Sequence, residues 1–207
     1  MLRILIADDH EIVRTGLKQI LREEYPFAEI EDAEDGNALV DKAVQKNWDI
    51  IISDLTMPGM TGIDALKVIK EKCPGCPVLI LSMYPEEQYA IRVIKAGAAG
   101  YLSKDMAQEQ LINAVRKVIS GKKYLNPSLT DQLISSTTGP TTPHDILSDR
   151  ELIVMKMIGA GKSTSDISQE LNLSPTTIST YRSRILDKMN MKSNAEITRY
   201  VIENNLL

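Results

Sequence analysis

The chain has 207 residues, of which 43% are apolar and 25% charged, and its formal net charge is −4. This length allows two small domains or one large one, and the composition is that of an ordinary globular protein. The mild negative charge excludes a chain that is basic throughout, and because no apolar run approaches about 18 residues, we expect no membrane span.

Five apolar runs predict strands, at residues 3–7, 28–33, 49–54, 77–82 and 99–103. The first, third and fourth are nearly continuous in Ile, Leu and Val, which is typical of strands covered on both faces. Segments of helical periodicity separate the five runs. Strict alternation of strand and helix predicts an α/β fold with a five-stranded, parallel, doubly wound sheet.

The pattern changes after residue 122. Residues 123–146 contain a stretch rich in Ser, Thr, Gly and Pro and predict a linker, in which residues 127–135 favour a short amphipathic helix. Residues 147–207 show only helical patterns and predict a second, all-α domain of four helices. Serine N-caps mark the starts of the first three of these helices, at Ser148, Ser163 and Ser174.

Polar side chains stand at the carboxyl ends of four predicted strands: Asp8 and Asp9, Asp54, Ser82 and Lys104. These ends meet at the ligand-binding edge of an open α/β sheet. Three clustered carboxylates favour a hard divalent cation such as Mg²⁺, and a lysine beside them suits a phosphoryl group. Asp54 is central and is the predicted nucleophile for an aspartyl-phosphate, with Ser82 placed to hydrogen-bond a phosphoryl oxygen.

Two other motifs could carry chemistry. Cys73 and Cys76 form a C-x-x-C, but no histidine near them completes a zinc site, and Pro74 and Gly75 favour a loop after a helix. We interpret both cysteines as incidental, and two thiols without a disulfide framework fit a reducing cytoplasm. His10 is a candidate for proton or metal chemistry, although a first-turn helix residue beside the acids is the simpler interpretation.

The motifs "IADDH", "SDLTMPGMTG", "LILS" and "GYLSK" resemble the receiver domain of bacterial response regulators, over residues 1–122. The resemblance implies a flavodoxin-like fold. It also implies that Asp54 accepts phosphate from a sensor histidine kinase. Asp8 and Asp9, together with Asp54 and the backbone carbonyl of Thr56, would then hold Mg²⁺.

The same resemblance assigns roles to three further residues. Lys104 matches the phosphate-binding lysine, and Ser82 and Tyr101 match the switch pair, in which the ring moves inward when the hydroxyl is drawn to the phosphoryl group. A rival interpretation is an aspartyl-phosphate phosphatase of the haloacid dehalogenase type. That family needs a second acid two residues after its nucleophile, where this chain has Thr56, so we expect a phosphoacceptor and not an enzyme with multiple turnover.

The segment 147–207 carries "LSDRE", "GKSTSDIS" and "LSPTTISTY", which resemble the LuxR-type helix-turn-helix domain. With a receiver, this places the chain in the NarL/FixJ class of response regulators. The family commonly has Lys at the position of Thr176 and His at that of Tyr181. Its base-contacting positions match Ser179, Thr180 and Ser183.

The predicted DNA-binding segment is not basic, since residues 145–207 hold as many Lys and Arg as Asp and Glu. The cations near its third helix are Arg182, Arg184, Lys188 and Lys192, which are candidates for phosphate contacts or form a solvated helix face. Weak binding by a monomer follows, and two copies on a two-fold site are expected.

The sequence therefore predicts a cytoplasmic transcription regulator of a two-component system. Phosphorylation of Asp54, with Mg²⁺ as cofactor, would shift homodimerisation and binding to double-stranded DNA. The alternative is a phosphate-independent DNA-binding protein whose receiver serves as a dimerisation or ligand module. A complete set of acids, serine and lysine disfavours that alternative.

Overall fold

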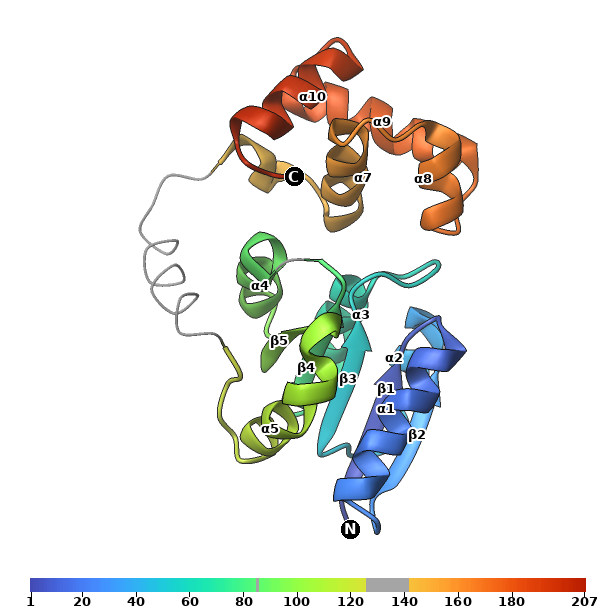
Figure 1. Cartoon of the computed structure of the whole chain (residues 1–207), viewed down its shortest axis with the longest axis vertical. Coiled ribbons are helices and arrows are strands. Elements are labelled where there is room, and N and C mark those ends of the chain that lie inside the picture. Colours follow the sequence, from blue (N-terminus) through green and yellow to red (C-terminus); the bar gives the residue numbers. More distant parts are fainter. Residues whose placement is uncertain (85, 126–141) are drawn as a thin grey trace. The chain divides into compact units, whose positions relative to one another are not determined.

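The computed structural model describes residues 1–84, 86–125 and 142–207 (Figure 1). Its contacts divide the chain into two compact units, Met1–Thr138 and Gly139–Leu207. The short helix predicted over 127–135 lies outside the described residues. Within the described part, no helix is both long enough and apolar enough to cross a bilayer.

The N-terminal unit is a five-stranded parallel sheet flanked by helices, with the strand order β2-β1-β3-β4-β5. The strands are β1 (Arg3–Ala7), β2 (Glu29–Ala33), β3 (Ile50–Asp54), β4 (Val78–Ser82) and β5 (Gly100–Ser103). The helices are α1 (Glu11–Glu24), α2 (Gly36–Gln45), α3 (Gly62–Lys72), α4 (Glu86–Lys95), the 3₁₀ turn η1 (Lys104–Met106) and α5 (Ala107–Ile119). The predicted flavodoxin-like fold is confirmed.

Helices cover both faces of this sheet (Figure 1). On one face, alternate residues of the central strands, such as Ile4, Ile52 and Leu81, pack with Leu21 of α1 and Leu111 of α5. Helices α2 and α3 contact each other on the opposite face. Strands β1, β3 and β4 are therefore almost wholly buried, as their continuous apolar runs predict, whereas the edge strand β2 is mostly half-buried.

The loop between β3 and α3 is folded tightly against the end of β3. The Gly62 N–H donates to the Leu55 carbonyl at 2.9 Å, and Thr61 caps α3 by accepting from the Asp64 N–H at 3.0 Å. A Cβ atom at Gly62 would lie 1.9 Å from the Asp54 carbonyl oxygen. Glycine at this position therefore lets the chain return close to Asp54.

A short segment beyond α5 packs against the first unit. Tyr124, which the sequence analysis assigns to the linker, forms a parallel bridge with Gly100 at the free edge of β5. The Tyr124 N–H donates to the Ala99 carbonyl at 2.8 Å, and its hydroxyl donates to Gln110 Oε1 at 2.5 Å. A Cβ atom at Gly100 would lie 2.6 Å from the Tyr124 carbonyl oxygen, so this close approach requires a glycine.

The C-terminal unit is helical in its described part. It comprises the 3₁₀ turn η2 (Pro143–Ile146) and the helices α7 (Asp149–Gly159), α8 (Thr164–Glu170), α9 (Pro175–Met189) and α10 (Asn194–Glu203). Ser148, Ser163 and Ser174 cap their helices as predicted. The turn η2 lies inside the predicted linker but belongs to this unit, because His144 Nδ1 lies 2.9 Å from the Tyr200 hydroxyl on α10.

Candidate functional site

Three side chains from separate strand ends meet in the N-terminal unit. Asp8 follows β1, Asp54 ends β3 and Lys104 follows β5. Lys104 Nζ lies 2.6 Å from Asp8 Oδ2 and 3.1 Å from Asp54 Oδ2. Both carboxylates are buried, at 0% and 2% exposure. Two buried acids therefore share one ammonium group at the carboxyl edge of the sheet.

Burial controls the protonation of this group. Loss of hydration raises the pKa of Asp54 to about 6, and the nearby Asp8 charge adds to this, while Lys104 and the Leu55 N–H work in the opposite direction. Burial alone would lower the pKa of Lys104, but the charges of Asp54 and Asp8 outweigh it and raise that pKa. Near neutral pH, Asp54 is therefore an ionised but poorly hydrated carboxylate beside a firmly charged lysine.

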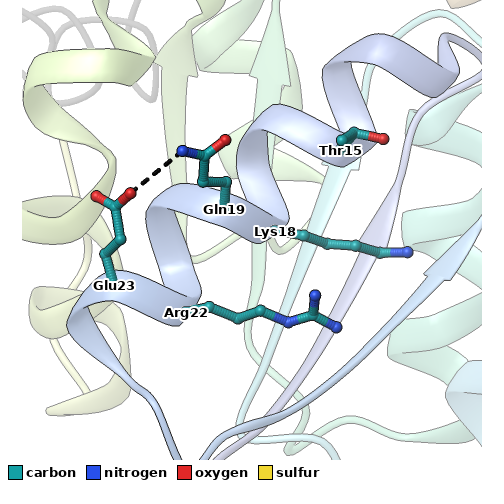
Figure 2. Close-up of a pocket in the computed structure, with 5 residues that line it drawn as sticks. All are labelled: Thr15, Lys18, Gln19, Arg22 and Glu23. Carbon is teal, nitrogen blue, oxygen red and sulfur yellow. Dashed lines mark hydrogen bonds between the residues drawn. The ribbon is translucent and has the colours of Figure 1, made fainter.

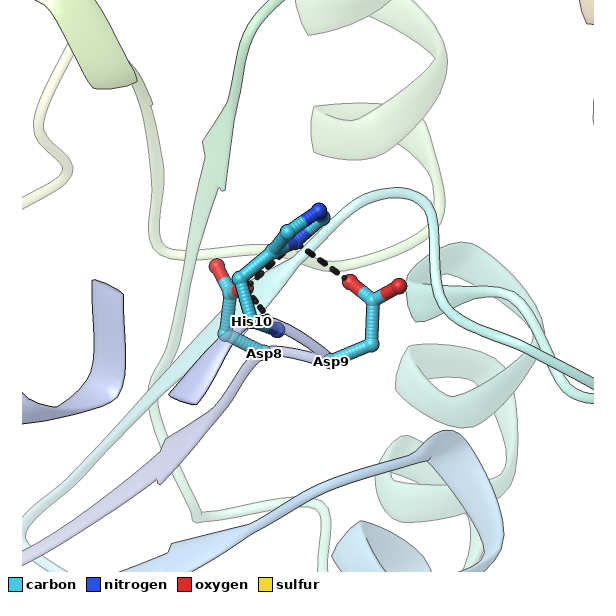
Figure 3. Close-up of side chains that lie close together, drawn as sticks. All are labelled: Asp8, Asp9 and His10. Atoms are coloured by element: carbon cyan, nitrogen blue, oxygen red, sulfur yellow. Dashed lines mark hydrogen bonds and ion pairs between the residues drawn. The ribbon is translucent and has the colours of Figure 1, made fainter. Parts of the chain in front are cut away.

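Asp8, Asp9 and His10 form a second, adjoining cluster (Figure 3). One ligand atom from each lies within 4.8 Å of the others. The His10 Nδ1 atom is 2.9 Å from Asp9 Oδ1 and 3.2 Å from Asp8 Oδ1. Asp54 is not part of this tight group and joins it through Lys104.

The oxygen atoms of this cluster fit a bound cation. Asp8 Oδ2 and Asp9 Oδ1 lie below the surface and make no hydrogen bond of good geometry. Lys104 Nζ lies 2.6 Å from Asp8 Oδ2, and His10 Nδ1 lies 2.9 Å from Asp9 Oδ1. Carboxylate oxygens of this kind are the ligands that hard divalent cations prefer. Thr56, whose backbone carbonyl is a further candidate ligand, is half-buried in the loop after Asp54.

The expected switch residues lie on neighbouring strands, and a third residue connects them. Ser82 and Tyr101 are fully buried. The Tyr84 N–H donates to Ser82 Oγ at 3.1 Å, and the Tyr101 hydroxyl donates to the Tyr84 carbonyl at 2.7 Å. The ring of Tyr101 therefore already occupies the inward position that the sequence analysis expects as one state of a switch.

The second and third helices of the C-terminal unit, α8 and α9, are joined by a turn at residues 171–174, the arrangement of a helix-turn-helix motif. Ile178 and Ile185 of α9 face inward with 1% and 0% exposure, whereas Ser179, Thr180 and Ser183 are exposed. A row of small hydroxyl groups therefore lies on the outer side of α9. The predicted base-contacting residues are thus accessible.

Two of these hydroxyls are already engaged. Ser179 Oγ donates to the Pro175 carbonyl at 3.0 Å, and Thr180 Oγ1 donates to the Thr176 carbonyl at 3.0 Å. Such bonds to the residue four positions earlier are common for Ser and Thr in helices. While they persist, each oxygen can only accept a hydrogen bond from a base, which limits the sequence information it can read.

The four candidate cations differ in their surroundings. Arg182 Nε donates to Asn194 Oδ1 at 2.6 Å. Lys188 Nζ lies 2.7 Å from Glu151 Oε2, whose side chain is only 3% exposed. Arg184 and Lys192 are exposed, and neither side chain is paired with any described residue. These last two are therefore the cations that are free to contact a DNA backbone.

Comparison with known families covers both units. Residues 4–116 match the model of the response regulator receiver domain, and residues 145–201 match that of the luxR family of bacterial regulatory proteins. The chain belongs to the NarL/FixJ class of response regulators.

Relatives of this response regulator match over its full length. The oxygen regulatory protein NreC of Staphylococcus carnosus is 36% identical, with 100% of this chain and 99% of the relative covered. The response regulator UvrY of Escherichia coli K12 is 34% identical, with 100% and 96% covered. These relatives carry the names of regulators, not of enzymes.

Solved structures share the architecture. A complex of the two-component response regulator RcsB with DNA has a TM-score of 0.58 and 26% identity, with 97% of each chain covered. A structure of two RcsB dimers bound to two parallel DNAs has a TM-score of 0.59, again with 26% identity and 97% coverage of each chain.

A hollow of about 510 Å³ on this response regulator lies along α1 (Figure 2). Its lining residues, Thr15, Lys18, Gln19, Arg22 and Glu23, all belong to that one helix. Within this set, Gln19 Nε2 donates to Glu23 Oε1 at 3.3 Å. No predicted site residue lines this hollow.

Proposed function

We propose that this response regulator is switched by phosphorylation of Asp54 and that its C-terminal unit then binds DNA as a dimer. The observation that carries the proposal is the position of Lys104, which contacts both Asp8 and Asp54 in a buried setting. Relatives with matching architecture support the regulatory role.

Each residue of the centre has a defined chemical task. An Asp54 carboxylate oxygen attacks phosphorus, a new P–O bond forms, and the bond from phosphorus to the donor breaks, so the donor group leaves. A sensor histidine kinase is the expected donor. Lys104 neutralises charge on the transferred group. Mg²⁺ would be held by Asp8, Asp9 and Asp54 with the carbonyl of Thr56, and when bound it supplies further charge neutralisation.

Acetyl phosphate with Mg²⁺ tests the first half of the proposal. Incubation should add one phosphoryl mass to the intact protein, and the label should be lost in acid, as for an acyl phosphate. Asp54→Ala should take up no label. Asp9→Ala should be labelled more slowly and only at higher Mg²⁺. Undiminished labelling of Asp54→Ala would refute the assignment of the nucleophile.

The DNA-binding half rests on α9. Its outer side presents hydroxyl groups and the unpaired cation Arg184, and the exposed Lys192 follows the end of the helix. This helix would enter the major groove. RcsB, which has a similar architecture, has been solved bound to DNA and as dimers on DNA. We infer the same kind of partner here, a homodimer on double-stranded DNA, and a cytoplasmic location.

The alternative, a receiver that dimerises without phosphate, makes a different prediction. It requires the same oligomeric state and the same DNA affinity before and after treatment with acetyl phosphate. A shift in both upon phosphorylation, absent in Asp54→Ala, would exclude it.

A further inference from the structure

We propose that His10 is a metal ligand and that Asp8, Asp9 and His10 together bind borderline divalent ions, such as Mn²⁺, Co²⁺ and Zn²⁺, more tightly than Mg²⁺. The proposal rests on the proposed function only in taking Asp8 and Asp9 as metal ligands. It adds a nitrogen ligand and a different preferred class of ion to that centre.

The spacing of the three ligand atoms fits one shared ion. Neighbouring ligands about 2.1 Å from a six-coordinate metal stand about 3 Å apart. His10 Nδ1 lies 2.9 Å from Asp9 Oδ1 and 3.2 Å from Asp8 Oδ1, and one ligand atom from each of the three residues falls within 4.8 Å of the other two. Figure 3 shows the imidazole beside both carboxylates. A metal ion would lie between the imidazole nitrogen and these oxygens.

The two carboxylates are set for this role by their burial. The Asp8 side chain is 1% exposed and that of Asp9 is 15% exposed. Asp9 Oδ1 makes no hydrogen bond of good geometry, and the His10 imidazole nitrogen Nδ1 lies 2.9 Å from it. An anionic oxygen that has lost most of its water gains strongly from a cation.

The His10 side chain does not serve to cap α1. His10 is the N-cap residue of α1, but its side chain makes no capping hydrogen bond. Its backbone N–H, not its ring, closes the local turn by donating to Asp8 Oδ1 at 2.9 Å. The ring is 62% exposed, so an ion can reach it from solvent.

The mixed ligand set determines the class of ion. Mg²⁺ prefers oxygen ligands and gains little from an imidazole, whereas later divalent transition metals and Zn²⁺ bind nitrogen well. Lys104 occupies the other oxygen of Asp8. Asp54 lies outside the three-residue cluster and remains available as the phosphoryl acceptor.

Metal binding to the metal-free full-length protein tests the proposal directly. Binding of Co²⁺ is followed by the absorption spectrum of the bound ion, which reports nitrogen ligation. Binding of Mg²⁺ is measured by its competition with Co²⁺. The variants are His10→Ala and, as a matched control, His144→Ala, since the chain has two histidines. Protein labelled with ¹⁵N-histidine reports Zn²⁺ binding at the imidazole nitrogen itself.

We expect the wild type and His144→Ala to bind Co²⁺ at least about tenfold more tightly than Mg²⁺, and His10→Ala to lose about tenfold in Co²⁺ affinity. Mg²⁺ affinity of His10→Ala should stay within about twofold of wild type. Zn²⁺ should shift the His10 nitrogen resonance. Unchanged Co²⁺ affinity in His10→Ala, or an unshifted His10 resonance at saturating Zn²⁺, overturns the proposal.

These outcomes are separable from failure of the proposed function. If His10→Ala is phosphorylated normally with Mg²⁺ while its Co²⁺ affinity is also normal, the role of Asp54 stands and that of His10 falls. If wild-type protein takes up no phosphate with any of these ions yet still binds Co²⁺ through His10, the phosphoacceptor assignment falls and the metal ligand stands.

Discussion

The carboxylate of Asp54, the proposed phosphoacceptor, lies in an environment that disfavours its charge. Its pKa is raised from 3.8 to about 6, chiefly by burial. The folded state therefore disfavours the ionised form that the proposed nucleophile needs. Above about pH 6, where Asp54 is ionised in both the folded and the unfolded state, its burial lowers the free energy of unfolding. As the pH falls from about 6 to about 4, the folded state protonates Asp54 before the unfolded state does, and the lost stability returns.

Replacing Asp54 by an uncharged isostere should remove this cost. In Mg²⁺-free buffer near pH 7.5, Asp54→Asn should raise the free energy of unfolding by about 2–3 kcal/mol, and the gain should disappear near pH 4. Urea unfolding at several pH values measures both effects. A gain that is the same at every pH would contradict the raised pKa of Asp54. Addition of Mg²⁺ should narrow the gap, since the ion stabilises the wild type more.

Two cations on α9 should respond differently to removal because only one is free. Arg184→Ala should weaken binding to all duplexes alike. It should also reduce, by about one, the steepness with which the logarithm of the binding constant falls with the logarithm of the salt concentration. Lys188→Ala should also lower the stability of the C-terminal unit, because it leaves the nearly buried Glu151 carboxylate without its partner.

Titration against specific and scrambled duplexes at two salt concentrations, together with thermal melting, separates these effects. If Arg184→Ala leaves the salt dependence of binding unchanged, Arg184 does not contact the DNA backbone. If Lys188→Ala melts like the wild type, its contact with Glu151 carries no stability.

At the scale of elements, the junction of β3 and α3 depends on a glycine. A methyl group at Gly62 would meet the backbone of Asp54, so Gly62→Ala must push the start of α3 away from the site. We expect a loss of about 1–3 kcal/mol in the free energy of unfolding and slower phosphorylation.

The matched control is Gly16→Ala in the middle of α1, where a methyl group would meet nothing within 4 Å. It should stabilise the protein by about 0.5–1 kcal/mol, because alanine favours a helix over glycine. Chemical unfolding of both variants and the rate of labelling by acetyl phosphate provide the comparison. Equal stability of the two variants would show that the junction tolerates a shift of α3.

At the scale of the whole molecule, the proposed homodimer would bring two DNA-binding units to one DNA site. Phosphorylated wild type should sediment as a dimer and prefer duplexes whose half-sites are about one helical turn, 10–10.5 base pairs, apart. Ser82→Ala should accept phosphate but lose most of this dimerisation, because the link from Ser82 through Tyr84 to Tyr101 is broken. Full dimerisation of phosphorylated Ser82→Ala would remove this link from the mechanism.

The sequence by itself determined the elements and the edge at which the acids meet. Continuous Ile, Leu and Val runs predict buried parallel strands, and parallel strands bring their ends to one edge, so the meeting of Asp8, Asp54 and Lys104 follows from periodicity and connectivity. Serine caps set the starts of the C-terminal helices in the same local way, because a cap bonds a backbone N–H only a few residues away.

Only the tertiary structure decided which side chains are partners. The bridge of Tyr124 to β5, the contact of Lys188 with Glu151 and the link of Tyr101 to Tyr84 join residues that are distant in sequence. The ring of His10 is close to both acids in sequence, but its direction depends on the turn into α1. Periodicity reports which face of an element is buried, whereas these contacts depend on the packing of one element on another, which no local pattern contains.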